Sequence, residues 1–267
     1  MSAPDLRPAT TVLLLREGQR GVEVFLVKRH GKSRFMPGAW VFPGGRVDDD
    51  DHTMPQNMVS GGEMTASRLG LSDDEATGFL VAGVRETFEE AGIWLGKGEL
   101  PEALRHPLNS GEVRFCDLLA AHQASIDLDV LKPWGWWVTP VSEPRRYDTR
   151  FVVATTDSDG SHDDGETIDS GWFHPTDALA AVDSGEVRMA PPTWWIVREL
   201  ERLAHVDAVL AHTDDRAIER ILPVLELADG TVRLTLPGHA NHPDAAIAGL
   251  PTEIVFDQGK WWAPKTD

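Results

Sequence analysis

Three glutamates, Glu86, Glu89 and Glu90, are related along the chain as i, i+3 and i+4. In a helix that spacing places all three carboxylates on one face. Like charges at this spacing destabilise a helix unless a positive charge lies among them. A divalent cation held by oxygen ligands would supply that charge, so the spacing indicates a metal site. The alternative is a solvated acidic face, which is the commoner explanation when glutamates are taken alone.

The residues on either side of the glutamates favour the metal site. Arg85 precedes them directly and Gly92 follows them, while Gly44 and Gly45 lie upstream at the end of a short predicted strand. A solvated acidic face does not require this combination of a glycine loop, an arginine and a closing glycine. We therefore interpret Gly44 and Gly45 together with residues 85–92 as one functional motif, called the framed segment below.

The element that must position the glutamates is a helix over about residues 73–91. Ser72 and Glu75 have the spacing of a capping box, and Gly92 stands where a helix commonly ends. The apolar residues that recur at about 3.6 residues, on the face opposite the glutamates, are Leu80, Val81, Val84, Phe88 and Ala91. One face of this helix is therefore expected to pack on a core, and the other to carry the carboxylates.

The rest of the chain alternates between predicted strands and helices. A hairpin is predicted over residues 10–28, single strands over 40–42, 134–139, 150–155, 171–173 and 253–256, and a second hairpin over 223–227 and 231–236. Helices are predicted over 175–184 and 191–211. Residues 48–70 are polar and contain Pro55, Gly61 and Gly62, so they are expected to form a loop that leaves the core.

Composition restricts the possible partners. The chain of 267 residues is 41% hydrophobic and 25% charged, which is typical of a soluble globular protein. With 25 basic and 43 acidic residues the net charge is −18, which would repel long nucleic acid but is compatible with a small anionic substrate bound through a cation. Cys116, the single cysteine, cannot form an internal disulfide, and no signal-peptide or membrane-spanning pattern occurs. A cytoplasmic protein without membrane contact is expected.

The framed segment resembles the Nudix box, whose pattern is Gly, five residues, Glu, seven residues, then Arg-Glu-U-x-Glu-Glu-x-Gly-U, with U an aliphatic residue. Gly45 matches the first glycine, whereas Thr87 departs from the pattern at a U position. The second half of the pattern is matched by Arg85, Glu86, Glu89, Glu90, Gly92 and Ile93. The resemblance implies a hydrolase that cuts a pyrophosphate bond in a substrate built as a nucleoside diphosphate linked to another group.

The box is interrupted, because the segment between Gly45 and Arg85 is about 26 residues longer than in the pattern. The isolated glutamate of the pattern consequently has no secure counterpart. Asp51 lies at the correct distance after Gly45, and Asp48 and Glu75 are competing candidates.

By this resemblance Glu86, Glu89 and Glu90 would bind Mg²⁺ or Mn²⁺, and Arg85 would hold the glutamates by ion pairing. Hydrolysis of a pyrophosphate requires that phosphate charge be neutralised and that a water be oriented and deprotonated. Paired carboxylates and a divalent metal can meet these requirements.

The general base varies within the family, and in some members it comes from a later loop. Glu166, in the acidic run before Trp172 and Phe173, is the candidate here for a base or an extra ligand. A solvated loop glutamate is an equally good reading of Glu166. Asp169 is a weaker candidate for the same role.

The segment upstream of Gly45 resembles the coenzyme A signature of some Nudix enzymes. The matched positions are Leu26, Arg29, Arg34, Gly38 and residues 42–45, whereas Val27 and His30 depart from the signature. Guanidinium groups bind phosphate bidentately, so Arg29 and Arg34, together with Gly44 and Gly45, are the expected substrate-binding residues.

A later stretch, Arg146-Tyr147-Asp148-Thr149-Arg150-Phe151, resembles a motif of the CoA diphosphatase branch, whose box is likewise interrupted. That resemblance implies cleavage of CoA or acyl-CoA to adenosine 3′,5′-bisphosphate and 4′-phosphopantetheine or its acyl form. ADP-ribose, NADH and nucleotide sugars are alternative substrates. A catalytically inactive Nudix module that senses a nucleotide is the alternative of another class.

The expected fold is the Nudix α/β/α sandwich with a mixed β-sheet, followed by a C-terminal helical and β-hairpin extension. We expect a Nudix domain over residues 1–190, with the insertion inside 46–84, and an extension over 191–267 packed on the same domain. A homodimer is one option for its assembly.

Overall fold

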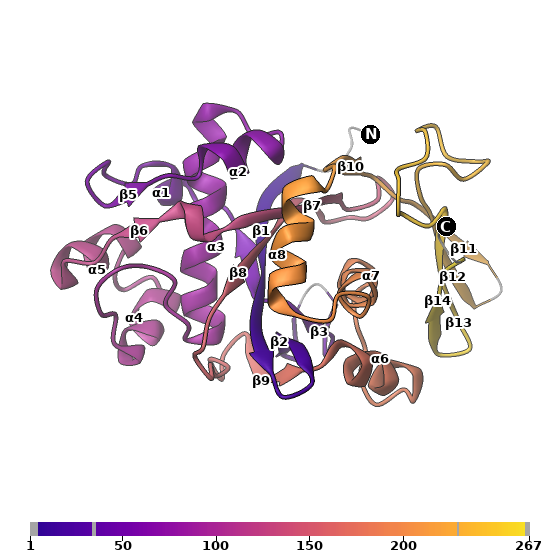
Figure 1. Cartoon of the computed structure of the whole chain (residues 1–267), viewed down its shortest axis with the longest axis horizontal. Coiled ribbons are helices and arrows are strands. Elements are labelled where there is room, and N and C mark those ends of the chain that lie inside the picture. Colours follow the sequence, from indigo (N-terminus) through magenta and orange to yellow (C-terminus); the bar gives the residue numbers. More distant parts are fainter. Residues whose placement is uncertain (1–4, 34–35, 229, 265–267) are drawn as a thin grey trace.

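A mixed β-sheet lies at the centre of the protein, with helices on both faces (Figure 1). The computed structural model describes residues 5–33, 36–228 and 230–264. The strand order is β10-β7-β8-β1-β2-β3, while β4 pairs with β1 and β9 pairs with β2. The strands are β1 (Leu6–Gly18), β2 (Gly21–Arg29), β3 (Trp40–Val41), β4 (Gly44–Arg46), β7 (Lys132–Val138), β8 (Arg146–Thr155), β9 (Thr167–Phe173) and β10 (Arg220–Ile221). Two pairs, β1 with β8 and β7 with β10, are parallel, and the others are antiparallel.

Side chains of β1 point alternately into two hydrophobic cores, one on each face of the sheet. Val12 and Leu14 belong to the core on the side of α3 (Asp73–Ala91). Leu13 and Leu15 belong to the core on the side of α7 (Pro191–Leu200). All four side chains are fully buried. Successive strand residues point to opposite faces, so a continuous apolar run in β1 requires that both faces be covered. The expected α/β/α sandwich with a mixed sheet is confirmed.

The carboxylate helix α3 has the bounds that its caps predict. It begins after the capping box of Ser72 and Glu75 and ends at Gly92, whose φ of 66° is left-handed. Gly83 lets the helix lie close to β1, because a Cβ there would come within 3.0 Å of the Thr10 side chain. The Thr10 hydroxyl also donates to the carbonyl of Phe79 at 2.6 Å. Helix α3 is thus fixed directly against the central sheet.

The insertion within the box does not loop away from the core, so that expectation is wrong. It forms α1 (Asp49–His52), β5 (Val59–Ser60) and α2 (Glu63–Arg68), and it buries Met54, Ala66 and Leu69 in the core beneath α3. These apolar residues are scattered among polar ones without a helical or strand period. The sequence pattern therefore gave no sign of their burial.

A second segment, between α3 and β7, packs against the insertion. It contains η1 (Glu102–Leu104), α4 (Arg105–Asn109), α5 (Phe115–His122), β6 (Ile126–Asp127) and η2 (Leu128–Val130). Strands β5 and β6 pair in parallel, and the Thr65 hydroxyl donates to the Leu131 carbonyl at 2.7 Å. Figure 1 shows these helices gathered on the α3 side of the sheet. The two segments together extend the layer that contains the carboxylate helix.

Arg150 fastens the insertion to the sheet. It is 3% exposed, its Nε donates to the Leu69 carbonyl at 2.9 Å, and its guanidinium lies 3.7 Å from the ring centroid of Trp136. Asp148 pairs with Arg150 and accepts from the Trp136 indole. Part of the stretch that resembles the CoA diphosphatase branch thus holds the insertion in place.

Truncation of Leu69 should destabilise the protein because its side chain is fully buried in this core. We expect Leu69→Ala to lower the free energy of unfolding by about 2–5 kcal/mol. Met64, on α2 and 57% exposed, provides the control, and Met64→Ala should change stability by less than about 0.5 kcal/mol. Chemical denaturation measures both, and equal small effects would mean that the insertion does not pack as described.

The C-terminal part differs from its prediction in its long helix and in β10, which was not predicted and joins the central sheet beside β7. The long helix expected over 191–211 is divided into α7 and α8 (Val206–Asp215). The break allows the carbonyl of Ala204 to accept from the Val22 amide at 3.1 Å, which ties the turn to β2. Helix α6 (Pro175–Asp183) lies beside α7. A separate antiparallel sheet follows, made of β11 (Val224–Ala228), β12 (Thr231–Thr235), β13 (Glu253–Asp257) and β14 (Lys260–Trp262).

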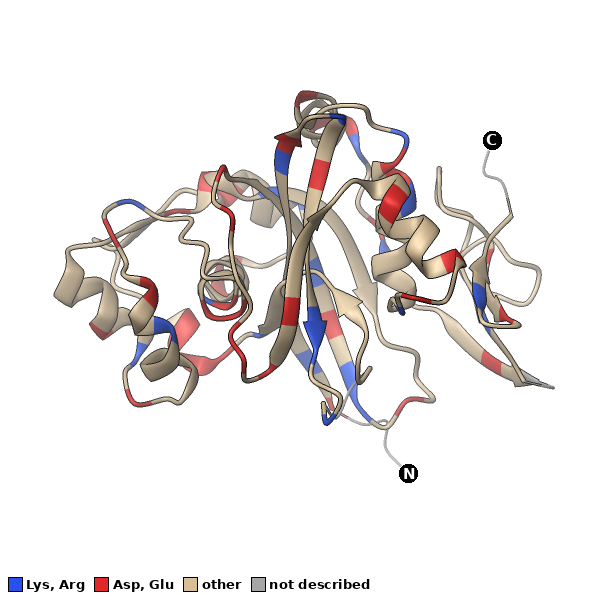
Figure 2. Ribbon diagram, turned by 90° about the horizontal axis from the view of Figure 1, so that it is seen from below, with Lys and Arg blue, Asp and Glu red and all other residues tan. Residues whose placement is uncertain are grey.

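Charge is distributed broadly over this fold. Figure 2 shows Asp and Glu on helices, strands and loops throughout the ribbon. The net charge of −18 is therefore not confined to the carboxylate helix, and the site must be judged by its local geometry. No helix in the described part of the chain is long and apolar enough to cross a membrane.

Candidate active site

Arg85 lies at the centre of the carboxylate cluster. Its side chain is 8% exposed, and its Nη1 donates to Glu86 Oε1 and to Glu89 Oε2, both at 3.0 Å. Its Nη2 donates to the carbonyl of Arg46 at 2.9 Å, so it also ties the helix to the end of β4. The expected ion pairing of Arg85 with the glutamates is present for Glu86 and Glu89.

Asp51 is the carboxylate that pairs bidentately with this arginine. Arg85 Nε donates to Asp51 Oδ1 at 2.9 Å, and Arg85 Nη2 donates to Asp51 Oδ2 at 2.8 Å. Asp51 is 2% exposed, whereas Asp48 is half exposed and lies 3.7 Å from the guanidinium. Glu75 caps α3 instead. Of the three candidates for the isolated acidic position, the geometry therefore selects Asp51, from α1 of the insertion.

The glycine pair brings the chain into direct contact with the glutamates. The backbone N–H of Gly44 donates to Glu90 Oε2 at 2.9 Å. At Gly45 a Cβ would lie 2.3 Å from Glu86 Oε1, so any larger residue would displace that carboxylate. Gly44 has φ of 153°, and a Cβ there would collide with the backbone of Thr10 on β1. Only glycine allows β4 to fit between β1 and the carboxylates.

The electrostatics of the cluster show an excess of negative charge. Burial raises the pKa of Glu86 to about 7, against the opposing effect of Arg85. Burial and then repulsion by Glu86 raise the pKa of Glu89 to about 8, and the same two causes raise the pKa of Glu90 well above its usual value. Burial acts to lower the pKa of Arg85, but its hydrogen bond with Asp51 and the nearby carboxylates outweigh burial and raise it. One arginine does not balance the buried carboxylates.

This donor set fits a hard divalent cation, because its carboxylate oxygens lie in a site whose negative charge exceeds the single positive charge of Arg85. Among the described residues, no three His, Cys, Asp or Glu side chains already converge as a metal cage. Glu86 and Glu89 face Arg85, and Glu90 faces the Gly44 amide. Coordination by all three would require their carboxylates to rotate toward a common point.

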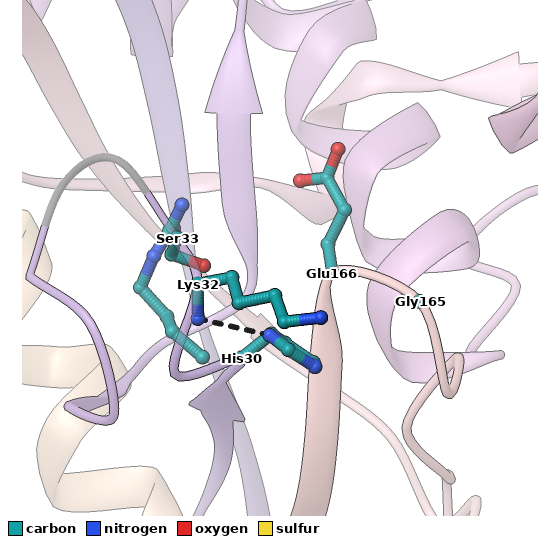
Figure 3. A pocket seen from close by; sticks show the side chains of 6 residues that line it. His30, Lys32, Ser33, Gly165 and Glu166 are labelled. Atoms are coloured by element: carbon teal, nitrogen blue, oxygen red, sulfur yellow. Dashed lines mark hydrogen bonds between the residues drawn. The ribbon is translucent and has the colours of Figure 1, made fainter.

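A pocket of about 430 Å³ is lined by Arg29, His30, Lys32, Ser33, Gly165 and Glu166 (Figure 3). The chain after β2 forms one wall, where the Lys32 amide donates to His30 Nδ1 at 2.9 Å. The residues before β9 form the other wall, and the two are joined by the His30 amide, which donates to the Glu166 carbonyl at 2.8 Å. The pocket combines the cationic side chains of Arg29 and Lys32 with the His30 ring and one carboxylate, Glu166.

Charged residues that line the pocket act on the pKa values of the carboxylate cluster. The charge of Arg29 acts to lower the pKa of Glu90, and the charge of Glu166 acts to raise the pKa of both Glu86 and Glu90. The Nε of Arg29 is buried and has no hydrogen-bond partner in the described part of the chain. Arg29 and Glu166 thus lie within electrostatic range of the carboxylate helix.

Two further residues expected from the sequence are Arg34 and Asp169. Arg34 lies outside the described residues. Asp169 lies in β9 opposite Lys28 and does not line the pocket. Sequence reasoning also missed Arg105, which is buried against the end of α3, because its surroundings carry no recognisable motif.

Comparison with known proteins agrees with this geometry. The family described as the NUDT19 Nudix domain matches residues 72–203. The acyl-coenzyme A diphosphatase NUDT19 of Gallus gallus is 30% identical over 280 residues, covering 83% of this chain and 73% of the relative. The Xenopus laevis protein of the same name is 27% identical over 306 residues, covering 94% and 80%. A crystal structure of a Nudix hydrolase from Alicyclobacillus acidocaldarius is similar with a TM-score of 0.67 and 26% identity, over 82% of this chain and all of that one.

The chain belongs to the Nudix hydrolase family. Within it, the protein is a Nudix pyrophosphohydrolase that resembles the CoA diphosphatase branch, as the sequence predicts. Nudix hydrolases generally use divalent metal ions, and the carboxylate cluster described above suits such an ion.

Proposed function

We propose that this enzyme is a divalent-metal-dependent hydrolase of CoA or acyl-CoA, with adenosine 3′,5′-bisphosphate and 4′-phosphopantetheine or its acyl form as products. The observation that carries the proposal is the pocket lined by Arg29, His30 and Lys32 beside the carboxylate helix. Such a pocket suits a substrate with a pyrophosphate and a further phosphate group. The names of the NUDT19 relatives support the same substrate class.

Glu86, Glu89 and Glu90 would hold Mg²⁺ or Mn²⁺. A bound divalent metal would neutralise phosphate charge and help to activate the attacking water. Arg85 orients Glu86 and Glu89 through its two hydrogen bonds, and Asp51 holds Arg85 in turn. The Gly44 amide holds the Glu90 carboxylate through its hydrogen bond.

Glu166 is proposed as the general base. Glu166 lines the pocket on the wall opposite the chain that carries His30 and Lys32, and its side chain is exposed (Figure 3). A base must come within hydrogen-bond reach of the water that it deprotonates. Position on a loop beside the carboxylate helix would allow Glu166 to do so.

The substrate is tested by metal-dependent hydrolysis of CoA, acetyl-CoA, dephospho-CoA, ADP-ribose, NADH and a nucleotide sugar, with the products identified by mass. We expect CoA or an acyl-CoA to give the highest kcat/KM, and adenosine 3′,5′-bisphosphate to appear among the products. Dephospho-CoA separates recognition of the pyrophosphate from recognition of the 3′-phosphate. Preference for ADP-ribose, NADH or a nucleotide sugar would replace the CoA proposal, and no turnover with any of them would favour a nucleotide sensor.

Arg29 provides the mutational test of the pocket. Loss of a charge-assisted phosphate contact costs about 1.5–3 kcal/mol, so Arg29→Ala should lower kcat/KM for CoA roughly 10- to 100-fold. Arg114, an exposed arginine paired with Asp117 outside the pocket, is the matched control, and Arg114→Ala should leave kcat/KM unchanged. An unchanged kcat/KM in Arg29→Ala would remove this pocket from the substrate path.

A further inference from the structure

Arg105 lies outside the Nudix box and outside the pocket, yet it contacts the catalytic helix directly. It begins α4 and is 6% exposed. Its Nε and Nη2 both donate to the backbone carbonyl of Glu89, at 3.2 and 3.0 Å. Glu89 is one of the three glutamates of the carboxylate cluster, so a buried charge is fixed to the backbone of a cluster residue.

The end of α3 needs such a donor. The last carbonyls of a helix have no partner within the helix, and the last turn of α3 has no basic residue of its own. The Gly92 amide donates to one of these carbonyls, that of Phe88, at 3.0 Å. The Ser161 amide donates to the Ala91 carbonyl at 2.8 Å. Arg105 supplies a partner for the Glu89 carbonyl, and the loop that contains Ser161 lies beside it at the end of the helix.

Arg105 also forms hydrogen bonds with the loop that contains Ser161. Arg105 Nη1 donates to the Ser161 hydroxyl at 2.8 Å, and Nη2 donates to the Ser161 carbonyl at 2.9 Å. Glu102 Oε1 accepts from Arg105 Nη1 at 3.0 Å and from the Ser161 hydroxyl at 2.7 Å. One planar guanidinium therefore joins the end of α3 to the loop between β8 and β9.

This loop continues to Glu166 through a compact turn. Asp163 Oδ1 accepts from the Thr167 amide at 2.8 Å, and Asp163 Oδ2 accepts from the Glu166 amide at 3.1 Å. Asn109, at the end of α4, donates to Asp163 Oδ2 at 3.1 Å. The short segment from Arg105 to Asn109 thus holds the loop at two points, and both lie before Glu166 in the chain.

We propose that Arg105 is a positioning residue, which sets the loop carrying Glu166 relative to the carboxylate helix. The inference rests on the proposed role of Glu166 as the base. Lysine has a single donor centre and cannot reach the Glu89 carbonyl, the Ser161 carbonyl and the Ser161 hydroxyl in one plane, whereas the guanidinium fork can. Replacement of Arg105 by lysine should keep the positive charge but lose these hydrogen bonds, so the loop that carries Glu166 should become more mobile.

The first measurement is steady-state kinetics of Arg105→Lys with whichever of CoA, ADP-ribose and NADH the wild type turns over fastest. Misplacement of a reacting group by about 1 Å can cost on the order of 100-fold in rate, so we expect kcat to fall about 10- to 100-fold. KM and the Mn²⁺ dissociation constant should change by less than about threefold, because the glutamates keep their own contacts with Arg85 and Gly44. Arg114→Lys, in the same segment between α3 and β7, is the matched control and should behave as wild type.

A double-mutant cycle with Glu166→Gln distinguishes positioning from general destabilisation. If Arg105 acts through Glu166, Arg105→Lys should lower kcat no further in the Glu166→Gln background. An equal fold-loss in both backgrounds, or a wild-type kcat for Arg105→Lys, would overturn the proposal. A Glu166→Gln variant with wild-type kcat would instead show that Glu166 is not the base, and the positioning role would fail with it.

Amide hydrogen exchange provides a readout that does not depend on the substrate. Arg105→Lys should exchange faster over residues 158–167, while the first half of α3 keeps its protection. Ser161→Ala removes only the hydroxyl contacts and should fold even if Arg105→Lys does not, with a kcat loss of roughly 3- to 10-fold. Unchanged exchange and kcat in Ser161→Ala would show that the contact does not hold the loop.

Discussion

Glu89→Gln is expected to lower kcat at least about 100-fold at saturating Mg²⁺ while the protein stays folded. Loss of a group that merely supports a metal ligand costs 10- to 100-fold, and loss of a ligand should cost at least as much. The amide can still accept the hydrogen bond from Arg85 Nη1. Burial and repulsion by Glu86 raise the pKa of Glu89 to about 8, so a neutral side chain relieves an unfavourable charge in the metal-free protein. Stability without metal should therefore be unchanged or higher.

Thermal unfolding with EDTA and with Mg²⁺ separates these effects. Wild type should gain stability on addition of Mg²⁺, because a ligand that binds only the folded protein stabilises it, and Glu89→Gln should gain much less. Glu75→Gln is a control on the same helix, since glutamine can also complete the capping box at Ser72. A Glu89→Gln variant with near-normal turnover would remove this helix as the metal site.

The carboxylate helix could be predicted from the sequence because each part of it leaves a local signal. Ser72 and Glu75 mark its start, Gly92 marks its end, and the apolar residues between them repeat at the helical period. The sandwich was expected from the resemblance to the Nudix box, and the continuous apolar run of β1, which is buried on both faces, agrees with it.

The insertion was misread because burial there depends on contacts between distant segments. The Leu69 carbonyl accepts from Arg150 Nε, and the Leu69 side chain is buried in the core that α3 shares; neither contact leaves a mark in the sequence near residue 69. The pairing of β5 with β6 joins residues more than sixty positions apart. Glycines and a proline indicated a loop, but turns between short packed elements have the same composition.

The isolated acidic position was left open for a similar reason. Spacing from Gly45 favoured Asp51, yet an acidic run offers several carboxylates at nearby positions. The short helix α1 determines which carboxylate reaches Arg85. Its N-terminus is capped by a hydrogen bond in which the Asp48 amide donates to Asp51 Oδ2 at 2.9 Å. A side chain one residue away would point elsewhere, because successive helical residues lie on different faces.

Asp51→Ala should be the most destabilising single change in the site. It would leave the buried guanidinium of Arg85 without its bidentate partner, and breaking a buried ion pair by removal of one member costs about 3–5 kcal/mol. Because Arg85 also orients Glu86 and Glu89, kcat should fall as well. Asp48→Ala is the control, since Asp48 is half exposed and only 3.7 Å from the same guanidinium, and it should cost less than about 1 kcal/mol. Urea denaturation of both variants decides the matter: equal stability losses would mean that the insertion supplies no specific partner to Arg85, and that the interrupted box functions without its isolated acid.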